Sequence, residues 1–406
     1  MFESIRRPAV LSVTLAAAGI LMVTMGTRQS FGLFISPINS STGLGIASIS
    51  FALAIGQFSW GAIQPIAGAI ADRYGPRVVL QVALITLALG CAITPFIENA
   101  FGLAIALGLL ASMGSGAGSF SVLIGAASQR LPVDARGTAS GVINAGGSFG
   151  QFVFAPILQK LIQSIGWMGA MWAMTIAALA ALPLIGKLGG AGQLPRQEAD
   201  DSKLGSVVWD ALHNSNYWLI HAGFFTCGFH LAFLVTHLPG EVNLCGLPPS
   251  VASWSLAIIG LSNVAGSLYS GSCVARYRSK YVLSAMYASR ALLVGVYLLL
   301  PRNEWTFYIF AAGLGFTWLS TVPPTASLVG KIFGNRYLAT LFGLTLVSHQ
   351  IGGFLGAWLG GLSLSIYGDL NYMWYADIAL AAFAALINLP IQEVDIENKL
   401  EVNSAN

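Results

Sequence analysis

Charged residues are scarce in this sequence of 406 residues: 19 are Lys or Arg, 16 are Asp or Glu, and together they make up 9% of the chain. Soluble domains of this length carry about 25% charged residues, so the composition excludes a soluble globular protein. Hydrophobic residues make up 55%, and the mean hydropathy is +0.73. The apolar runs are each about 20 residues or longer, which is typical of membrane-spanning helices rather than barrel strands. The sequence therefore predicts an all-α integral membrane protein.

Several kinds of chemical site are also missing. No phosphate-binding loop, cluster of metal ligands or nucleophile–base pair stands out, which disfavours ATP-driven transport and membrane enzymes. The net charge of +3 indicates a bias of basic residues among loops rather than nucleic-acid binding. We therefore expect no enzyme activity, no cofactor, no metal and no nucleic-acid partner. The cysteines lack the spacing of a metal site or disulfide framework: Cys91, Cys227, Cys245 and Cys273.

Apolar runs between polar breaks predict twelve spanning helices. We expect them over residues 10–35, 47–71, 78–97, 100–128, 138–163, 166–186, 216–239, 250–273, 281–300, 305–330, 338–366 and 371–391. The most polar long stretch, KLGGAGQLPRQEADDSKLG, lies between the sixth and seventh spans. It predicts two six-helix bundles, 1–187 and 216–406, joined by a cytoplasmic linker over 188–215.

The basic residues predict the orientation of these spans. With the N-terminus inside, 15 of the 19 fall in cytoplasmic segments, and the other four are Arg28, Lys160, Arg290 and Arg302. The bias of basic residues toward the cytoplasm sets the orientation of membrane proteins. The first apolar run is too long for a cleavable signal. We expect a multi-pass, monomeric protein of the inner (cytoplasmic) membrane with both termini in the cytoplasm.

An internal repeat appears at half the chain length. ADRYGPRVVL at 71–80 aligns without gaps to VARYRSKYVL at 274–283, and TMGTRQSF at 24–31 aligns to TCGFHLAF at 226–233. The second alignment places Arg28 opposite His230. Parallel six-helix repeats form one class of transporter, with the substrate site at their interface.

GAIADRYGPR at 68–77, between the second and third spans, resembles the Gly-x-x-x-Asp-Arg-x-Gly-x-Arg loop of the major facilitator superfamily. TRQSFGLF at 27–34 and HQIGGFLGAWLGG at 349–361 resemble bacterial monocarboxylate-type permeases. The resemblance implies the twelve-helix fold, transport by alternating access, and a loop that stabilises one conformation as a latch. The predicted latch residues are Gly68, Asp72, Arg73, Gly75, Arg77 and Arg136. The other interpretation is that the arginines of this loop only set the orientation of the spans in the membrane.

Two positions depart from the families. Monocarboxylate permeases carry an acid and an arginine in the eighth span, where this chain has Asn263 and Ser267. This departure weakens a simple lactate-like assignment. The Gly-Pro signature of drug/proton antiporters is missing from the fifth span, where the sequence reads GVINAGGSFGQF. That difference makes a multidrug transporter less favoured.

Polar residues inside apolar spans are the candidates for a substrate site, because a charged group at the centre of a membrane helix costs about 3 kcal/mol. Spans 1, 4, 7 and 10 line the cavity in proteins of this fold, so Arg28 is expected to face it and bind an anion through its planar fork. The other interpretation is an arginine that snorkels to the interface. Arg290 and Asp377 lie in peripheral spans. We expect a structural role for Arg290 and a position near the membrane interface for Asp377. The predicted substrate-binding residues are Arg28, Phe31, Gln57, His230, Asn263, Trp318, His349 and Gln350.

The leading hypothesis is a secondary transporter of a small, monocarboxylate-like organic anion. Arg28 would anchor the anion, and His230 and His349 would orient it or carry a coupled proton. The other hypotheses are an exporter of amphipathic or drug-like compounds and a membrane sensor that binds without transport. The predicted partners are the anion, protons and the lipid bilayer.

Overall fold

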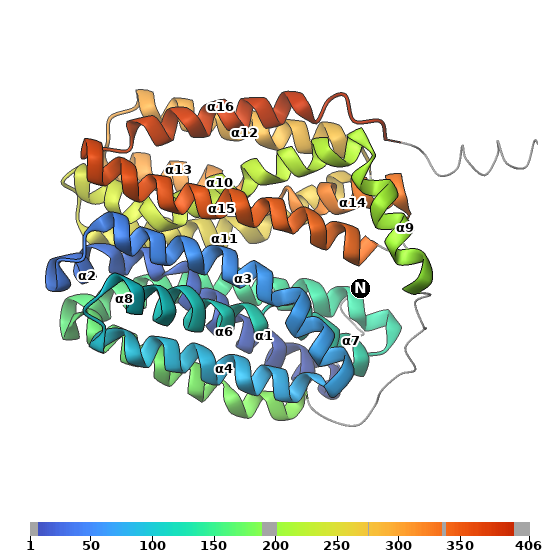
Figure 1. The fold of residues 1–406 in the computed structure, drawn as a ribbon, viewed down its shortest axis with the longest axis horizontal. Helices are drawn as coiled ribbons and strands as arrows, with labels where there is room; N and C mark the ends of the chain where they lie inside the picture. Colours follow the sequence, from blue (N-terminus) through green and yellow to red (C-terminus); the bar gives the residue numbers. More distant parts are fainter. Residues whose placement is uncertain (1–6, 189–200, 275, 335–337, 394–406) are drawn as a thin grey trace, which may run out of the picture.

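The computed structural model describes residues 7–188, 201–274, 276–334 and 338–393, and every regular element in these ranges is helical. The helices run roughly parallel to one long axis (Figure 1). The predicted all-α class and its twelve crossings are confirmed. Helices are the expected form for such apolar segments, because in lipid the backbone must satisfy its hydrogen bonds internally.

The first half of the chain forms the blue-to-green helices in the lower part of Figure 1. Its longer elements are α1 (Pro8–Gln29), η2 (Phe31–Phe34), α2 (Ile35–Thr42), α3 (Ile46–Tyr74), α4 (Pro76–Ile93), α7 (Phe120–Arg130) and α8 (Val133–Ala180). Shorter segments complete it: η3 (Thr94–Phe96), α5 (Ala100–Leu103), η4 (Ala104–Ala111), α6 (Ser112–Ala117) and η5 (Leu182–Lys187).

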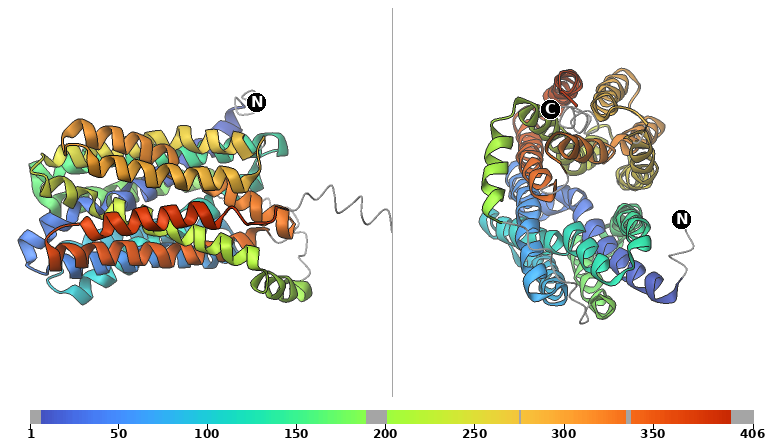
Figure 2. Two further views of the ribbon diagram at one scale, coloured as in Figure 1. Left: turned by 90° about the horizontal axis from the view of Figure 1, so that it is seen from above. Right: turned by 90° about the vertical axis from the view of Figure 1, so that its right-hand side faces the viewer.

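The second half forms the yellow-to-red helices above it. Its elements are α10 (Ser215–Leu244), α11 (Pro249–Val274), α12 (Ser279–Leu299), α13 (Glu304–Thr317), α14 (Val322–Phe333), α15 (Leu338–Tyr367) and α16 (Asn371–Ile387). A further helix, α9 (Asp201–Leu212), lies within the predicted linker, at the end of the molecule where the chain begins (Figures 1 and 2). We call this the α9 end, and the opposite end the far end.

Eight helical stretches in the described ranges have the length and composition to cross a membrane. One of them, Ala139–Lys187, is 49 residues long and contains two crossings. Within α8, Gly166 has a φ of 78°, so this one residue turns the chain between the fifth and sixth crossings. The tenth crossing breaks between Thr317 and Val322, just before Pro323 and Pro324, because proline cannot continue a helix from the preceding turn.

The two halves contact each other along two main helix pairs, α3 with α15 and α8 with α11. A third contact joins η2 to α10, where a Cβ at Gly32 would clash with the Val235 carbonyl. Glycines at these contacts let the helices approach closely. Gly361 packs on Ser50 of α3, and Gly260 packs on Ser148 of α8.

The same helix pairs separate toward the α9 end. Gly68 of α3 and Gly343 of α15 each have open space where a Cβ would project, and so do Gly141 of α8 and Gly271 of α11. Gly68 and Gly343 lie two turns beyond Gly61 and Gln350, which are in contact. The halves are therefore in contact at the centre and at points toward the far end, and apart at the α9 end.

Candidate substrate-binding site

Arg28 lies in the last turn of α1, where the helix gives way to the 3-10 turn η2. Its guanidinium donates to Oε1 of Gln57 on α3 and lies over the ring of Trp60, 4.1 Å from Cζ to the ring centroid. Nη1 is 3.5 Å from Oε1 of Gln29. Among the described residues, Arg28 forms no ion pair with a carboxylate. An amide oxygen and an aromatic face stabilise a cation without neutralising it, so Arg28 retains charge for another acceptor.

Two small adjoining cavities lie beside Arg28, between the halves of the chain. One has a volume of about 50 Å³ and is lined by Met25, Arg28, Gln29, Gln57, Trp60, Phe120, Leu231, Ala232, Val235, Leu319 and His349. The other, of about 20 Å³, is lined by Arg28, Gln29, Phe31, Gly32, Leu53, Gly56, Gln57, Ser112, Val235 and Thr236. Helices α1, α3 and α10 contribute to both. A small ligand in these cavities would therefore contact both halves at once.

His349 brings a second titratable group to the larger cavity, from α15 in the other half. The residue is 6% exposed, its ring centroid lies 5.0 Å from that of Phe224, and its Nδ1 has no hydrogen-bond partner in the described part of the chain. A neutral or protonated imidazole could orient or attract an anion there. The structure thus brings together the predicted residues Arg28, Gln57 and His349, and places Phe31 at the smaller cavity.

Gln57 and Gln350 form a reciprocal contact between α3 and α15. Gln57 packs on Gly353 of α15, and Gln350 packs on Gly61 of α3. Gln57 uses its oxygen to hold Arg28, whereas both amide atoms of Gln350 lack partners among the described residues. Gln350 is 2% exposed and does not line either cavity. Its predicted contact with substrate stays a prediction.

His230 points away from these cavities. Its Nδ1–H donates to Oδ2 of Asp377 on α16 at 2.6 Å, and both residues are fully buried. The interfacial position expected for Asp377 is wrong, because the carboxylate lies in the protein interior as the partner of His230. The repeat aligns His230 with Arg28, but the contact with Asp377 gives His230 a different environment from that of Arg28.

Asn263 and Trp318 also lie outside the cavities. Asn263 donates to Oγ of Ser148 across the α8–α11 contact at 2.9 Å, and its Oδ1 accepts from the backbone N–H of Leu319 at 3.0 Å. Trp318 is fully buried, and its carbonyl accepts from Arg290. Their predicted substrate contacts stay predictions. Arg290 binds carbonyls at the end of α13, the structural role expected for it.

The loop resembling the superfamily latch joins α3 to α4. Gly75 has a φ of 90°, a conformation that glycine adopts without strain, and Pro76 begins α4. Arg73 and Arg77 are exposed, and Cζ of Arg73 lies 5.4 Å from the ring centroid of Tyr74. The side chains of Asp72 and Arg136 lie outside the described part of the structure. Their role as a latch stays a prediction.

A carboxylate that the sequence did not point to occupies the matching loop of the second half. Glu393 accepts from the backbone N–H groups of Ser279 and Lys280 at the start of α12, at 3.0 and 3.4 Å. It also forms an ion pair with Lys331 of α14 at 2.5 Å. We call Glu393, Lys331 and Ser279 the C-half clamp. The repeat has Ala275 where the first half has an acid, and Glu393, far along the chain, was not detectable by alignment.

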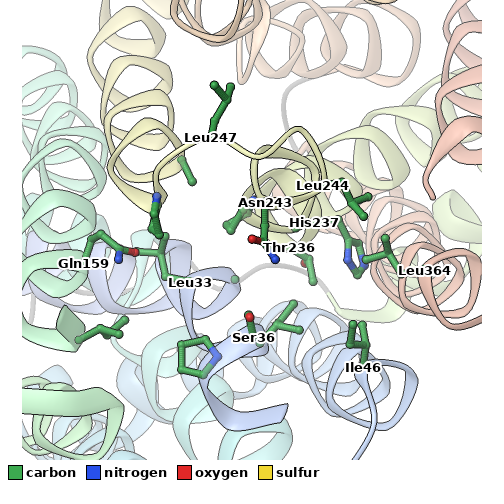
Figure 3. A pocket seen from close by; sticks show the side chains of 18 of the residues that line it. Leu33, Ser36, Ile46, Gln159, Thr236, His237, Asn243, Leu244, Leu247 and Leu364 are labelled. Carbon is green, nitrogen blue, oxygen red and sulfur yellow. The ribbon is translucent and has the colours of Figure 1, made fainter. Parts of the chain in front are cut away.

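A larger pocket, of about 300 Å³, opens between the halves at the far end (Figure 3). Leu33, Ser36 and Ile46 of the first half face Thr236, His237 and Leu244 of the second. No Asp, Glu, Lys or Arg is among the described residues that line it. This far-end pocket is separated from the Arg28 cavities by the contact between Gly32 and α10.

Sequence reasoning also missed Trp60, which supports the Arg28 guanidinium. The signal was present, because Gln57 and Trp60 are three residues apart and share one face of α3. For Asp377 the sequence showed an acid in an apolar helix but not which neighbour it faced.

Comparison with known proteins agrees with this arrangement. Residues 17–356 match the profile of the Major Facilitator Superfamily. The chain is similar to monocarboxylate transporter 13 of Rattus norvegicus, with 26% identity over 93% of this chain and 88% of the relative. It is also similar to the oxalate:formate antiporter of Oxalobacter formigenes, with 23% identity over 91% of this chain and 87% of the relative.

Solved structures give the same fold. A D-xylose–proton symporter superposes with a TM-score of 0.71 at 14% identity, over 95% of this chain and 98% of the other. A bacterial homolog of the human lysosomal transporter Spinster, in an inward-facing and occupied conformation, gives 0.71 at 16% identity, over 95% of each chain. The chain described here is therefore a multi-pass secondary transporter that belongs to the Major Facilitator Superfamily.

Proposed function

We propose that this transporter moves a small organic anion of the monocarboxylate class by alternating access, with Arg28 as its anchor. The observation that carries the proposal is a guanidinium in a cavity between the two halves, held by an amide and an aromatic ring, with no carboxylate partner in the described residues. Burying a charge without a counter-ion costs free energy. An anionic substrate would offset that cost and could accept two hydrogen bonds from the planar fork.

His349 faces Arg28 from the other half, so one anion in the larger cavity would be held by α1 and α15 together. Binding of this kind couples occupancy to the relative position of the halves, since a ligand favours the state in which both contacts form. The names of the two relatives, a monocarboxylate transporter and an oxalate:formate antiporter, support the carboxylate class.

The conformation supports alternating access by movement of residues 1–187 against residues 216–406. The halves are in contact toward the far end and apart at the α9 end. We propose that the α9 end is cytoplasmic, that both termini lie there, and that the protein resides in the inner membrane, because the basic residues favour that side. The described conformation would then be inward-facing. We further propose that transport is coupled to protons.

The test is ligand binding to purified protein with radiolabelled formate, oxalate and lactate. Arg28→Lys keeps the charge but loses the fork and should weaken binding noticeably, and Arg28→Ala should nearly abolish it. A charge-assisted hydrogen bond contributes about 1.5–3 kcal/mol, which corresponds to roughly 10- to 150-fold in affinity. Arg302→Lys is the matched control, because Arg302 is paired with Glu241 away from the cavities. Equal affinity in wild type and Arg28→Ala would contradict the proposal.

A second candidate is export of amphipathic compounds, which the uncharged far-end pocket favours. Its volume of about 300 Å³ exceeds that of the Arg28 cavities, and its lining is largely apolar. The polar residues that line it are Ser36, Gln159, Gln163, Thr236, His237 and Asn243. In this case Arg28→Ala would leave transport intact and Leu244→Trp, which fills the pocket, would reduce it. The two variants together separate the candidates.

A further inference from the structure

The second half contains a buried titratable pair that the anion site does not use. His230 and Asp377 join α10 to α16 through one hydrogen bond of 2.6 Å, and neither residue is exposed. The other nitrogen, Nε2 of His230, and the other oxygen, Oδ1 of Asp377, have no hydrogen-bond partner among the described residues. Buried polar atoms are nearly always paired. Two unpaired atoms in one pair mark a place where a proton can be added.

Arg290 brings a permanent charge to the same region from α12. It is fully buried, donates to the carbonyls of Thr317 and Trp318, and places Nη1 3.5 Å from Sγ of Cys227. Cys227 lies one turn before His230 on α10 and therefore shares its face. The Arg290 cation and the Asp377 carboxylate thus lie beside neighbouring turns of one face of α10.

The other groups beside Cys227 and His230 on α10 carry no permanent charge. The Trp318 ring lies 6.4 Å from that of His230, and Thr321 contacts Cys227 at 3.2 Å. The Tyr287 hydroxyl, on α12, donates to the carbonyl of Gly223. From α15, His349 lies beside Cys227 and reaches the larger cavity. Cys227 and His349 therefore connect the buried cluster to the anion site.

The charge of this cluster depends on one proton. With His230 neutral and Asp377 ionised, the Arg290 charge is balanced and the cluster has no net charge. A proton added to Nε2 of His230, or to Oδ1 of Asp377, gives the cluster a charge of +1. That charge attracts an anion held at His349, and by linkage the anion favours the proton equally. One proton and one monovalent anion then bind, and leave, as a neutral pair.

We propose that the His230–Asp377 pair is the proton-binding site through which anion transport is coupled to protons. The identity of the coupled anion rests on the proposed function. The proton site is argued independently, from the buried His230–Asp377 pair. It also accounts for a carboxylate in the membrane interior of a chain whose eighth span has Asn263 and Ser267 in place of an acid and an arginine.

The coupling is tested in proteoliposomes with radiolabelled formate and lactate. Asp377→Asn and His230→Gln should lose accumulation driven by a pH gradient, while exchange of labelled for unlabelled anion across the membrane is retained. His221→Gln is the matched control, because His221 is a buried histidine of α10 that pairs with Oγ of Ser348 instead, at 2.6 Å. It should keep both activities.

Two results would overturn the coupling role. One is full pH-driven accumulation by Asp377→Asn. The other is loss of both accumulation and exchange in a variant whose thermal unfolding matches wild type, since a pair needed for movement of the anion itself, rather than for the proton, predicts that pattern.

A second measurement needs no substrate. The infrared carboxyl or imidazole bands of the ligand-free protein, recorded over a pH titration, should contain a pH-dependent component that Asp377→Asn removes. No such component in folded wild-type protein would overturn the proton site. If wild type binds neither formate nor lactate, the proposed anion function fails, and the infrared titration still decides whether the pair takes up a proton.

Discussion

At the scale of single residues, Gln57 determines what Arg28 can bind. The amide oxygen accepts one N–H of the guanidinium but leaves its charge in place. A carboxylate at the same position would neutralise that charge and compete with a substrate anion. The side chain of residue 57 therefore decides whether the cavity presents a cation or an ion pair.

Gln57→Glu should weaken anion binding by at least about tenfold, because the new internal ion pair replaces hydrogen bonds that contribute about 1.5–3 kcal/mol to the anion. The measurement is equilibrium binding of formate and lactate. Gln64→Glu, two turns along α3, is the control, since Gln64 hydrogen-bonds only the carbonyl of Trp60 in the described structure. Unchanged affinity in Gln57→Glu would show that Arg28 does not bind the anion through its charge.

At the scale of elements, the C-half clamp holds the start of α12 against α14. Burial raises the pKa of the Glu393 carboxyl, but hydrogen bonds from Lys331 and from the Ser279 and Lys280 amides lower it, and the pKa lies below its usual value. A carboxylate with a lowered pKa stabilises the folded state above the unfolded pKa, near ~4.3. That contribution is lost as the pH falls through the folded-state pKa.

Glu393→Gln should lower the unfolding temperature at neutral pH and should flatten its decline as the solution is acidified. Thermal unfolding of the detergent-purified protein, followed from neutral to acidic pH, measures both effects. Glu304→Gln removes an exposed acid from the first turn of α13 and serves as the control. A variant with the wild-type pH profile would exclude the clamp from the stability of the fold.

The boundaries of the helices were largely predictable from the sequence, whereas the side-chain contacts between helices were not. Apolar runs indicated α3 and α15, because local composition determines where a helix can cross lipid. The repeat placed Arg28 opposite His230, but contacts between helices decide where a side chain points. Asp377 turned His230 away from the cavity, and Glu393 supplied an acid that the repeat lacked. Such long-range pairings leave no periodic signal.

At the scale of the whole molecule, the separation of the halves at the α9 end predicts how the transporter closes. Gly68 of α3 and Gly343 of α15 both lie two turns beyond the contact of Gly61 with Gln350, and both have open space where a Cβ would project. When the α9 end closes, these positions must meet, and glycines allow the closest approach.

Gly343→Leu should therefore fold and bind anion but lose transport, since the added side chain fits the described conformation and obstructs the closed one. Binding and uptake by the same preparation measure this difference. Gly295→Leu on α12 is the matched control, because Gly295 also has open space but α12 does not contact the first half through any main helix pair. Wild-type uptake by Gly343→Leu would show that the two helices do not close at this level.

The uncharged lining of the far-end pocket has a kinetic consequence. An anion diffusing toward it meets no fixed charge on the described walls, whereas the α9 end carries the exposed residues Arg73, Arg77 and Arg276. Basic groups around an opening accelerate the encounter with anions, and dissolved salt screens this attraction over about 10 Å at 0.1 M. The two directions of transport should therefore respond unequally to ionic strength: added potassium chloride should slow anion capture from the α9 side and leave capture from the far side nearly constant.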